Sequence, residues 1–205
     1  MTRKIIIACL LTLLGSQSVW ASTSWYATVD TSSIAGQSGW LDFQFNPADF
    51  SAPGASATVS SFNSNGTLLS TVTASGDVSG DLGSALVLGN SQPFNDWLQA
   101  YVFGTTLRFL FDLDVPVPNS SGSGTAFSLS LYDSAFNSLL ADPVWGAALV
   151  ANANDNGSVD ILGQSAQVSL STASPVPEPQ TLPLFLTGLG LLGMRLRKKS
   201  LPPKS

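Results

Sequence analysis

The sequence predicts an all-β protein whose single domain, residues 22–170, is an antiparallel β-sandwich or jelly-roll-like fold. Apolar and polar residues alternate over short segments such as Leu41–Phe45 and Leu107–Asp114. Alternation with a period of two is typical of strands that bury one face. Turn-forming pairs such as Asn156-Gly157 separate these segments. The stretch contains no lysine and no glutamate, so two of the residues that usually favour exposed helices are missing.

The individual strands follow from the same alternation and from the turns between them. Many short strands at this spacing favour a sandwich or jelly roll. The polar stretch Pro116–Gly124 is interpreted as a loop within one domain, because the strand pattern resumes on both sides of it. One helical turn is expected around Gln92–Leu98. The expected strands are Trp25–Thr31, Leu41–Phe45, Ala55–Ser61, Thr67–Thr73, Ala85–Leu88, Trp97–Phe103, Leu107–Asp114, Phe127–Leu131, Ala147–Ala151, Val159–Leu162 and a last one around Val168 and Leu170.

Residues 1–21 have the three-part layout of a secretory signal peptide. Two basic residues precede the apolar stretch Ile5–Leu14, and the small residues Ala21 and Ser22 offer a cleavage site between them. The apolar stretch is too short to span a bilayer. The only cysteine, Cys9, lies inside it, so we expect a mature protein without disulfides.

The C-terminal tail combines a proline-containing linker, a short apolar segment and a basic cluster. The linker spans residues 171–180, and residues 181–205 hold the apolar segment Leu182–Met194. At about 1.5 Å per residue this segment covers roughly 20 Å of a ~30 Å hydrocarbon core, so we expect a short transmembrane helix. The basic residues are expected to stay on the cytoplasmic side; they are Arg195, Arg197, Lys198 and Lys199.

This tail resembles the PEP-CTERM sorting signal of Gram-negative bacteria. The motif is formed by Pro177, Glu178 and Pro179, and the short Gly- and Leu-rich span and the basic cluster follow it. The resemblance implies export by the secretion machinery, a transient inner-membrane intermediate, and removal of the tail by a membrane protease called exosortase. It also implies a final location in the outer envelope or the extracellular matrix. A plain single-span anchor is the alternative, and the shortness of the apolar segment argues against it.

The body of the chain also resembles an uncharacterised group of β-rich PEP-CTERM proteins. The matching stretches are GWLDFQFNP, GDVSGDLGSALVLGN and GTAFSLSLYD. This resemblance implies a shared β-rich domain and no known activity, so it supplies no site residues.

Charge and residue types exclude several functions. Between residues 22 and 180 the only basic residue is Arg108, while all thirteen acidic residues lie there. Such an acidic body repels nucleic acid, so no nucleic-acid partner is expected. The chain has no histidine, which excludes a Ser-His-Asp triad and a His-bound zinc site. Asp112 and Asp114 share one strand face with Arg108, which favours a solvated face over a catalytic carboxylate pair. We therefore expect that the protein is not an enzyme.

The stretch NANDNGSVD is a candidate calcium loop. Its alternating oxygen-bearing side chains and its glycine are typical of such loops. Gly163, however, stands where a bidentate glutamate is expected, and a hairpin turn at Asn156-Gly157 explains the pattern equally well. Calcium is thus the only candidate cofactor, and its candidate ligands are Asn152, Asn154, Asn156 and Asp160.

Aromatic residues offer flat apolar faces on which sugar rings stack, and the candidates are Trp40, Trp97 and Trp145. Two functional hypotheses follow. The first is an exported, non-enzymatic envelope or matrix protein that an exosortase processes. The alternative is a carbohydrate-binding module of the extracellular polysaccharide of a biofilm matrix. The sequence names no ligand, oligomeric state or biological process.

Overall fold

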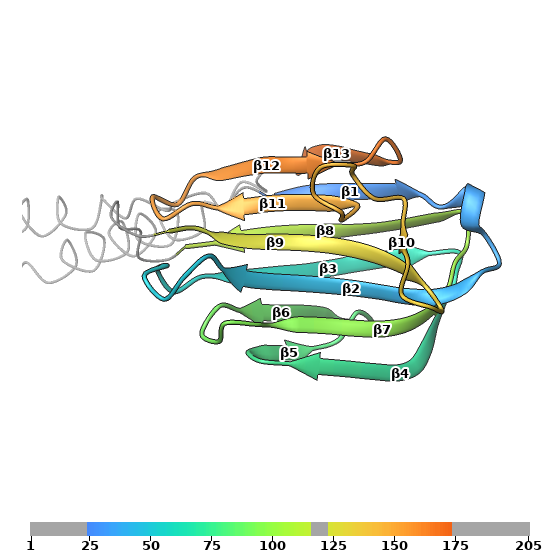
Figure 1. Cartoon of the computed structure of the whole chain (residues 1–205), viewed down its shortest axis with the longest axis horizontal. Coiled ribbons are helices and arrows are strands. Elements are labelled where there is room, and N and C mark those ends of the chain that lie inside the picture. Colours follow the sequence, from blue (N-terminus) through green and yellow to red (C-terminus); the bar gives the residue numbers. More distant parts are fainter. Residues whose placement is uncertain (1–23, 116–122, 174–205) are drawn as a thin grey trace, which may run out of the picture. The chain divides into compact units, whose positions relative to one another are not determined.

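The computed structural model describes residues 24–115 and 123–173 (Figure 1). They belong to the first of two units of the chain, Met1–Ser174 and Pro175–Ser205. The regular elements of the described residues are strands, apart from the 3₁₀ turn η1 (Ser32–Ile34). The strands are β1 (Ser24–Asp30), β2 (Ser38–Pro47), β3 (Ser56–Ser64), β4 (Thr67–Ser75), β5 (Val78–Gly80), β6 (Ala85–Gly89), β7 (Asp96–Val102), β8 (Thr106–Asp114), β9 (Thr125–Asp133), β10 (Ser138–Leu139), β11 (Leu149–Ala153), β12 (Val159–Gln164) and β13 (Val168–Ala173).

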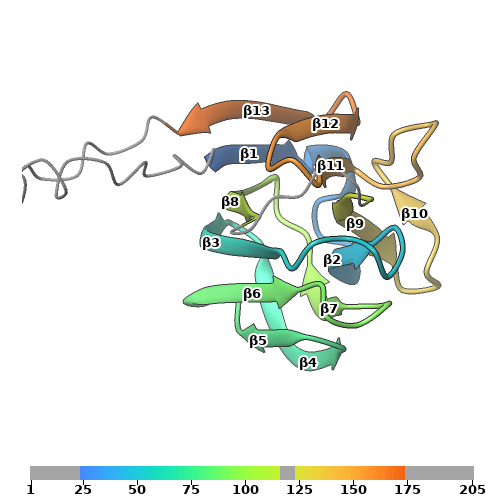
Figure 2. The same ribbon diagram turned by 90° about the vertical axis from the view of Figure 1, so that its left-hand side faces the viewer.

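The strands form two antiparallel sheets, which confirms the predicted all-β architecture. The six-stranded sheet has the order β13-β1-β8-β3-β6-β5. The seven-stranded sheet has the order β12-β11-β9-β2-β7-β4, and the short β10 pairs with β9. Figure 2 shows the two sheets face to face, as in a sandwich. Strands β1 to β4 alternate between the sheets, and connections of this kind are typical of Greek-key sandwiches and jelly rolls.

Aromatic side chains from both sheets meet in the shared core. The rings of Phe43 in β2 and Phe109 in β8 lie 5.3 Å apart, edge to face. The rings of Phe111 in β8 and Phe127 in β9 stack at 5.1 Å. All four residues are completely buried, and each such side chain contributes roughly 1.5–3 kcal/mol through burial. Because alternate residues of a strand face opposite sides, the neighbours of these core residues lie on the outer faces of the sheets.

Two short strands and one turn differ from the prediction. Strands β5 and β10 were not predicted, because three and two residues are too few to show a period. The helical turn expected around Gln92–Leu98 is wrong, since β7 begins at Asp96. The amide of Asn95 organises this connection instead: its Nδ2 donates to the backbone oxygens of Phe45 (2.9 Å) and Gln92 (2.8 Å).

The expected terminal segments lie outside the described residues. This holds for the signal peptide, residues 1–21, and for the membrane segment within 181–205. Within residues 24–115 and 123–173, no helix is long and apolar enough to cross a membrane. Strand β13 continues to Ala173, so regular structure extends three residues beyond the expected domain boundary at 170.

Candidate functional site

The residues of the predicted sorting signal are not among those that the structure describes. The Pro177-Glu178-Pro179 motif and the basic residues Arg195, Arg197, Lys198 and Lys199 lie outside the described ranges. The predicted cleavage site, Ala21 and Ser22, does so as well. The described residues therefore contain only the candidate ligand-binding residues, which are the three tryptophans and the calcium loop.

Two of the three candidate tryptophans do not offer a free ring face. Trp40 lies on the outer face of β2, and the ring of Phe136 stacks on it at 5.4 Å with an interplanar angle of 14°. Phe136 is 54% exposed, so it covers Trp40 and presents its own ring to solvent. Trp97 lies opposite Phe43 in the β2–β7 pair and therefore points toward the core. Its Nε1 donates to Oε1 of Gln99 at 3.1 Å.

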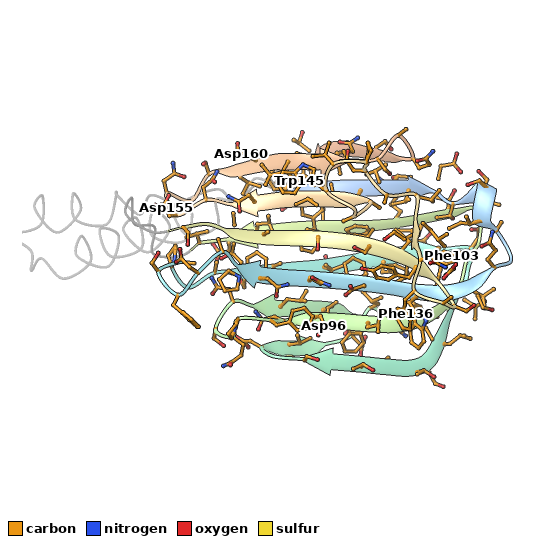
Figure 3. The ribbon with its side chains drawn as sticks, viewed as in Figure 1. Asp96, Phe103, Phe136, Trp145, Asp155 and Asp160 are labelled. Carbon is orange, nitrogen blue, oxygen red and sulfur yellow. The ribbon has the colours of Figure 1, made fainter. Side chains whose placement is uncertain are left out.

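Trp145 is the most accessible of the three candidates. It lies in the connection between β10 and β11 (Figure 3). The residue is 48% exposed. Asp142 fixes this connection, because its Oδ1 accepts hydrogen bonds from the backbone N–H groups of Val144 (2.9 Å) and Trp145 (3.0 Å). The indole lies against Gly163 of β12, where an added Cβ would clash with Cδ1 and Cγ of Trp145. The glycine thus gives the ring a fixed seat while about half of the residue remains exposed.

The four candidate calcium ligands lie in the β11–β12 hairpin, and hydrogen bonds link three of them: Asn152, Asn154 and Asp160. Asn152 lies opposite Asp160. Nδ2 of Asn152 donates to Oδ1 of Asn154 at 2.6 Å, and Nδ2 of Asn154 donates to Oδ2 of Asp160 at 2.8 Å. Oδ1 of Asn156 accepts hydrogen bonds from the N–H (2.9 Å) and Oγ (2.7 Å) of Ser158. These side chains therefore close the hairpin themselves, and calcium binding here stays a prediction.

The outer face of the six-stranded sheet carries the charged residues of β8, as predicted. The guanidinium carbon of Arg108 lies 4.7 Å from the centre of the Tyr26 ring. Oγ of Ser24 donates to Oδ2 of Asp112 at 3.0 Å. Arg108 and Asp114 are exposed, so this is a solvated face that contains a cation.

A second pair of aspartates, which the sequence did not single out, lies on the outer face of the seven-stranded sheet. Asp42 of β2 is opposite Leu98 of β7, and Asp96 of β7 is opposite Gln44 of β2. The two aspartates are thus diagonal neighbours, with Cα atoms about 7–8 Å apart in such a pair. Asp42 is 5% exposed and Asp96 is 7% exposed, although both lie at positions that face away from the core. Figure 3 shows Asp96 on β7.

A chain of amide hydrogen bonds leads to Asp42. The backbone N–H of Asn95 donates to Oδ1 of Asn46 at 2.7 Å. Nδ2 of Asn46 donates to Oε1 of Gln44 at 3.1 Å, and Nε2 of Gln44 donates to Oδ2 of Asp42 at 2.6 Å. The polar alternation Asp-x-Gln-x-Asn along β2 is the sequence signal that could have indicated this row.

One carboxylate oxygen of each aspartate has no hydrogen-bond partner among the described residues. Oδ1 of Asp42 and Oδ1 of Asp96 are buried, and neither has a hydrogen-bond partner among the described residues. Burial raises the pKa of Asp42 to about 6, the hydrogen bond from Gln44 opposes the increase, and the charge of Asp96 adds to it. The pair therefore contains two buried carboxylate oxygens that accept no hydrogen bond from the described residues.

Two antiparallel sheets around a common core define the described part of the chain as an all-β domain. A family model of the PEP-CTERM protein-sorting motif matches residues 175–199. The chain therefore carries this motif where the sequence predicted it, and the motif implies a secreted, membrane-transiting protein that an exosortase processes. No curated protein and no solved structure matches the chain.

Proposed function

We propose that the chain is an exported, non-enzymatic protein of the cell envelope or the extracellular matrix, sorted and processed by an exosortase. The sorting motif at residues 175–199 carries this proposal. The motif begins directly after β13, which ends at Ala173. Removal of the tail would therefore leave every described strand in the product.

The residue types of the chain support a role without catalysis. No histidine is present, and the single cysteine lies in the predicted signal peptide. The usual general base, the thiol nucleophile and the imidazole ligands of metal centres are thus missing from the proposed mature chain. The secretion machinery and the exosortase are the proposed transient partners, and the outer envelope or the matrix is the proposed final location.

Mass spectrometry of the mature termini tests the sorting route. We expect the wild-type protein to begin near Ser22 and to end near Pro177-Glu178-Pro179. A variant with all three motif residues changed to alanine should keep its C-terminal residue, Ser205, and should stay in the membrane fraction. Gln180→Ala, next to the motif, is the matched control and should be processed normally. Recovery of wild-type protein with an intact Ser205 terminus from the membrane fraction would contradict the proposal.

Polysaccharide binding is the second candidate function, and the exposure of Trp145 favours it. The indole of Trp145 packs against Gly163 of β12, and about half of the residue is exposed. Such a ring is suited to stacking on a sugar ring. The neighbouring Val144 is also exposed, which extends the apolar surface. The sugar-binding surface would then comprise Trp145 alone of the three predicted tryptophans.

Pull-down of the protein with purified extracellular polysaccharide of the producing cells tests this candidate. We expect retention of the wild type and an association about 5- to 150-fold weaker for Trp145→Ala, because stacking of a nucleobase, a comparable flat ring, on one aromatic side chain contributes about 1–3 kcal/mol. Phe50→Ala is the control, since Phe50 is 91% exposed and lies in a different loop. Equal retention of the two variants would show that Trp145 does not contribute to polysaccharide binding.

A further inference from the structure

The Asp42–Asp96 pair has no cationic side chain to balance it. Arg108 is the only arginine or lysine in residues 24–115 and 123–173, and it lies on the other sheet. The pairings of β2, β7, β9 and β4 place only neutral neighbours around the pair, and Tyr132 is the one other titratable group among them. These neighbours are Trp40, Gln44, Leu98, Ala100, Ser128, Ser130, Tyr132, Thr73 and Ser75.

The burial of the pair makes this lack of a counter-charge significant. Both aspartates are more than nine-tenths buried, and each keeps one carboxylate oxygen without a hydrogen-bond partner among the described residues. A buried carboxylate is stable only with a proton, a hydrogen-bond donor or a cation beside it. The amide chain through Gln44 satisfies Oδ2 of Asp42 and so leaves Oδ1 as the acceptor that remains.

We propose that the carboxylates of Asp42 and Asp96 bind a divalent cation, calcium, at the outer face of the seven-stranded sheet. The donors are all oxygen atoms, and calcium is the divalent ion that accepts carboxylates in flexible geometry at 2.3–2.6 Å. Two aspartates on diagonal positions of adjacent strands can each direct one oxygen to a shared ion, while water supplies the remaining ligands. The partly exposed Gln44 and Leu98 border the pair, so the ion would lie just below the surface.

This site differs from the predicted loop at Asn152–Asp160. In the hairpin, side-chain amides already donate to Oδ1 of Asn154 and to Oδ2 of Asp160. The backbone N–H and the hydroxyl of Ser158 donate to Oδ1 of Asn156. In the Asp42–Asp96 pair, one oxygen of each carboxylate has no such donor among the described residues. The inference depends on the folded domain alone and is independent of sorting and of polysaccharide binding.

Calcium titration of the full chain, purified in detergent and freed of divalent ions with EDTA, tests the proposal. We expect calcium to raise the unfolding temperature at pH 7 with an apparent Kd of about 10⁻⁴–10⁻³ M, the range of extracellular calcium modules. Asp42→Asn and Asp96→Asn should each weaken calcium binding at least tenfold in isothermal titration calorimetry. Asp114→Asn, an exposed aspartate of the other sheet, is the matched control and should bind as the wild type does.

Three further measurements locate the ion and separate it from misfolding. Asp160→Asn should keep the calcium response, and loss of the response in this variant alone would place the ion in the hairpin and overturn the proposal. Terbium, used in place of calcium, should show tryptophan-sensitised emission because Trp40 lies two residues from Asp42 on the same face, and Asp42→Asn should abolish it. Asp42→Asn should unfold in EDTA at no lower temperature than the wild type. If 10 mM calcium leaves the wild-type unfolding temperature unchanged, the proposal fails.

Discussion

The outer faces of the two sheets carry the same residue type in opposite settings. On the six-stranded sheet, Asp112 and Asp114 share their strand face with Arg108; Arg108 and Asp114 are exposed, and Asp112 is half-buried. On the seven-stranded sheet, Asp42 and Asp96 are buried, and the neighbouring side chains are neutral. Both pairs lie at positions that alternate with core residues. The alternation of residues along a strand therefore determines which face of the sheet a carboxylate lies on. The side chains on the neighbouring strands determine whether that carboxylate is exposed to solvent.

A substitution in the core between the two sheets should have the largest effect on the free energy of unfolding. Phe43 of the seven-stranded sheet packs against Phe109 of the six-stranded sheet. Because Phe→Ala at a buried site removes burial and leaves a cavity, we expect Phe43→Ala to lower the free energy of unfolding by about 3–5 kcal/mol. Urea unfolding followed by far-UV circular dichroism and by tryptophan fluorescence measures this loss. Two separate transitions would show that the faces do not depend on one core.

The next largest effect should come from Asp42→Asn and should depend on pH. The folded-state pKa of Asp42, about 6, lies above the reference value of 3.8, so ionisation opposes folding. In EDTA, this group lowers stability as the pH rises from about 3.8 through 6, and the loss at pH 7 is about 3 kcal/mol. The substituted asparagine cannot ionise, so the variant should be more stable than the wild type at pH 7 by up to that amount and nearly equal to it at pH 4. A difference that is the same at both pH values would contradict this prediction.

Other carboxylates have pKa shifts of the opposite sign, and they do not disturb this measurement because both proteins contain them. A side-chain hydrogen bond from Ser32 lowers the pKa of Asp30, and one from Asn137 lowers the pKa of Asp133. Their contribution to stability is present above the reference value of 3.8 and is lost as the pH falls through their lowered pKa values. The wild type and the Asp42→Asn variant share these groups, so the difference between the two proteins isolates Asp42.

A basic side chain introduced on the outer face of the seven-stranded sheet should give Asp42 the cationic neighbour that the aspartates of the six-stranded sheet have in Arg108. Leu98 is directly opposite Asp42 and partly exposed, so Leu98→Arg would bring a guanidinium beside the carboxylate. An opposite charge at about 4–6 Å lowers the pKa of an aspartate by roughly 1–3 units. We expect a lower pKa of Asp42 in an NMR titration of the side-chain carboxyl carbon, and a gain of about 1–2 kcal/mol at pH 7 in EDTA. Leu98→Gln is the neutral control and should leave this pKa unchanged.

The smallest effect should come from the solvated face. Arg108 contacts Tyr26 at an exposed position, where a cation–π contact contributes about 0.5–1 kcal/mol. Arg108→Ala should therefore lower the free energy of unfolding by no more than about 1 kcal/mol, and Asp114→Asn should change it by less than about 0.5 kcal/mol. Urea unfolding of both variants at pH 7 measures these values. A loss above about 2 kcal/mol for either variant would show that this face is not a simple solvated surface.

The fold class could be predicted because the core residues of β2, β8 and β9 are apolar at every second position. The pairing of the strands could not, since it depends on contacts between segments far apart in the sequence. Asp42 and Asp96 become neighbours only through the β2–β7 register, so no local pattern indicates the pair.

The exposure of the tryptophans depended on the same long-range information. Trp97 lies among polar residues in the sequence, yet the register places it opposite Phe43 and toward the core. Trp40 lies at an outward position, yet Phe136, from a connection after β9, covers it. The sorting motif, in contrast, is a local sequence feature, and the sequence alone was sufficient to find it.

The position of β1 has a consequence for timing. This first strand lies between β8 and β13, and Ser24 pairs with Ala173 at the far end of the domain. At a synthesis rate of about 5–20 residues per second, β1 would appear roughly 7–30 s before its last partner. Until then the leading strand has one side without a neighbour, and pairing over such a long separation is intrinsically slow. A chain that is exported with its N-terminus first would thus still be incompletely folded while it crosses the membrane. Strands β1 and β13 would pair and complete the six-stranded sheet only afterwards.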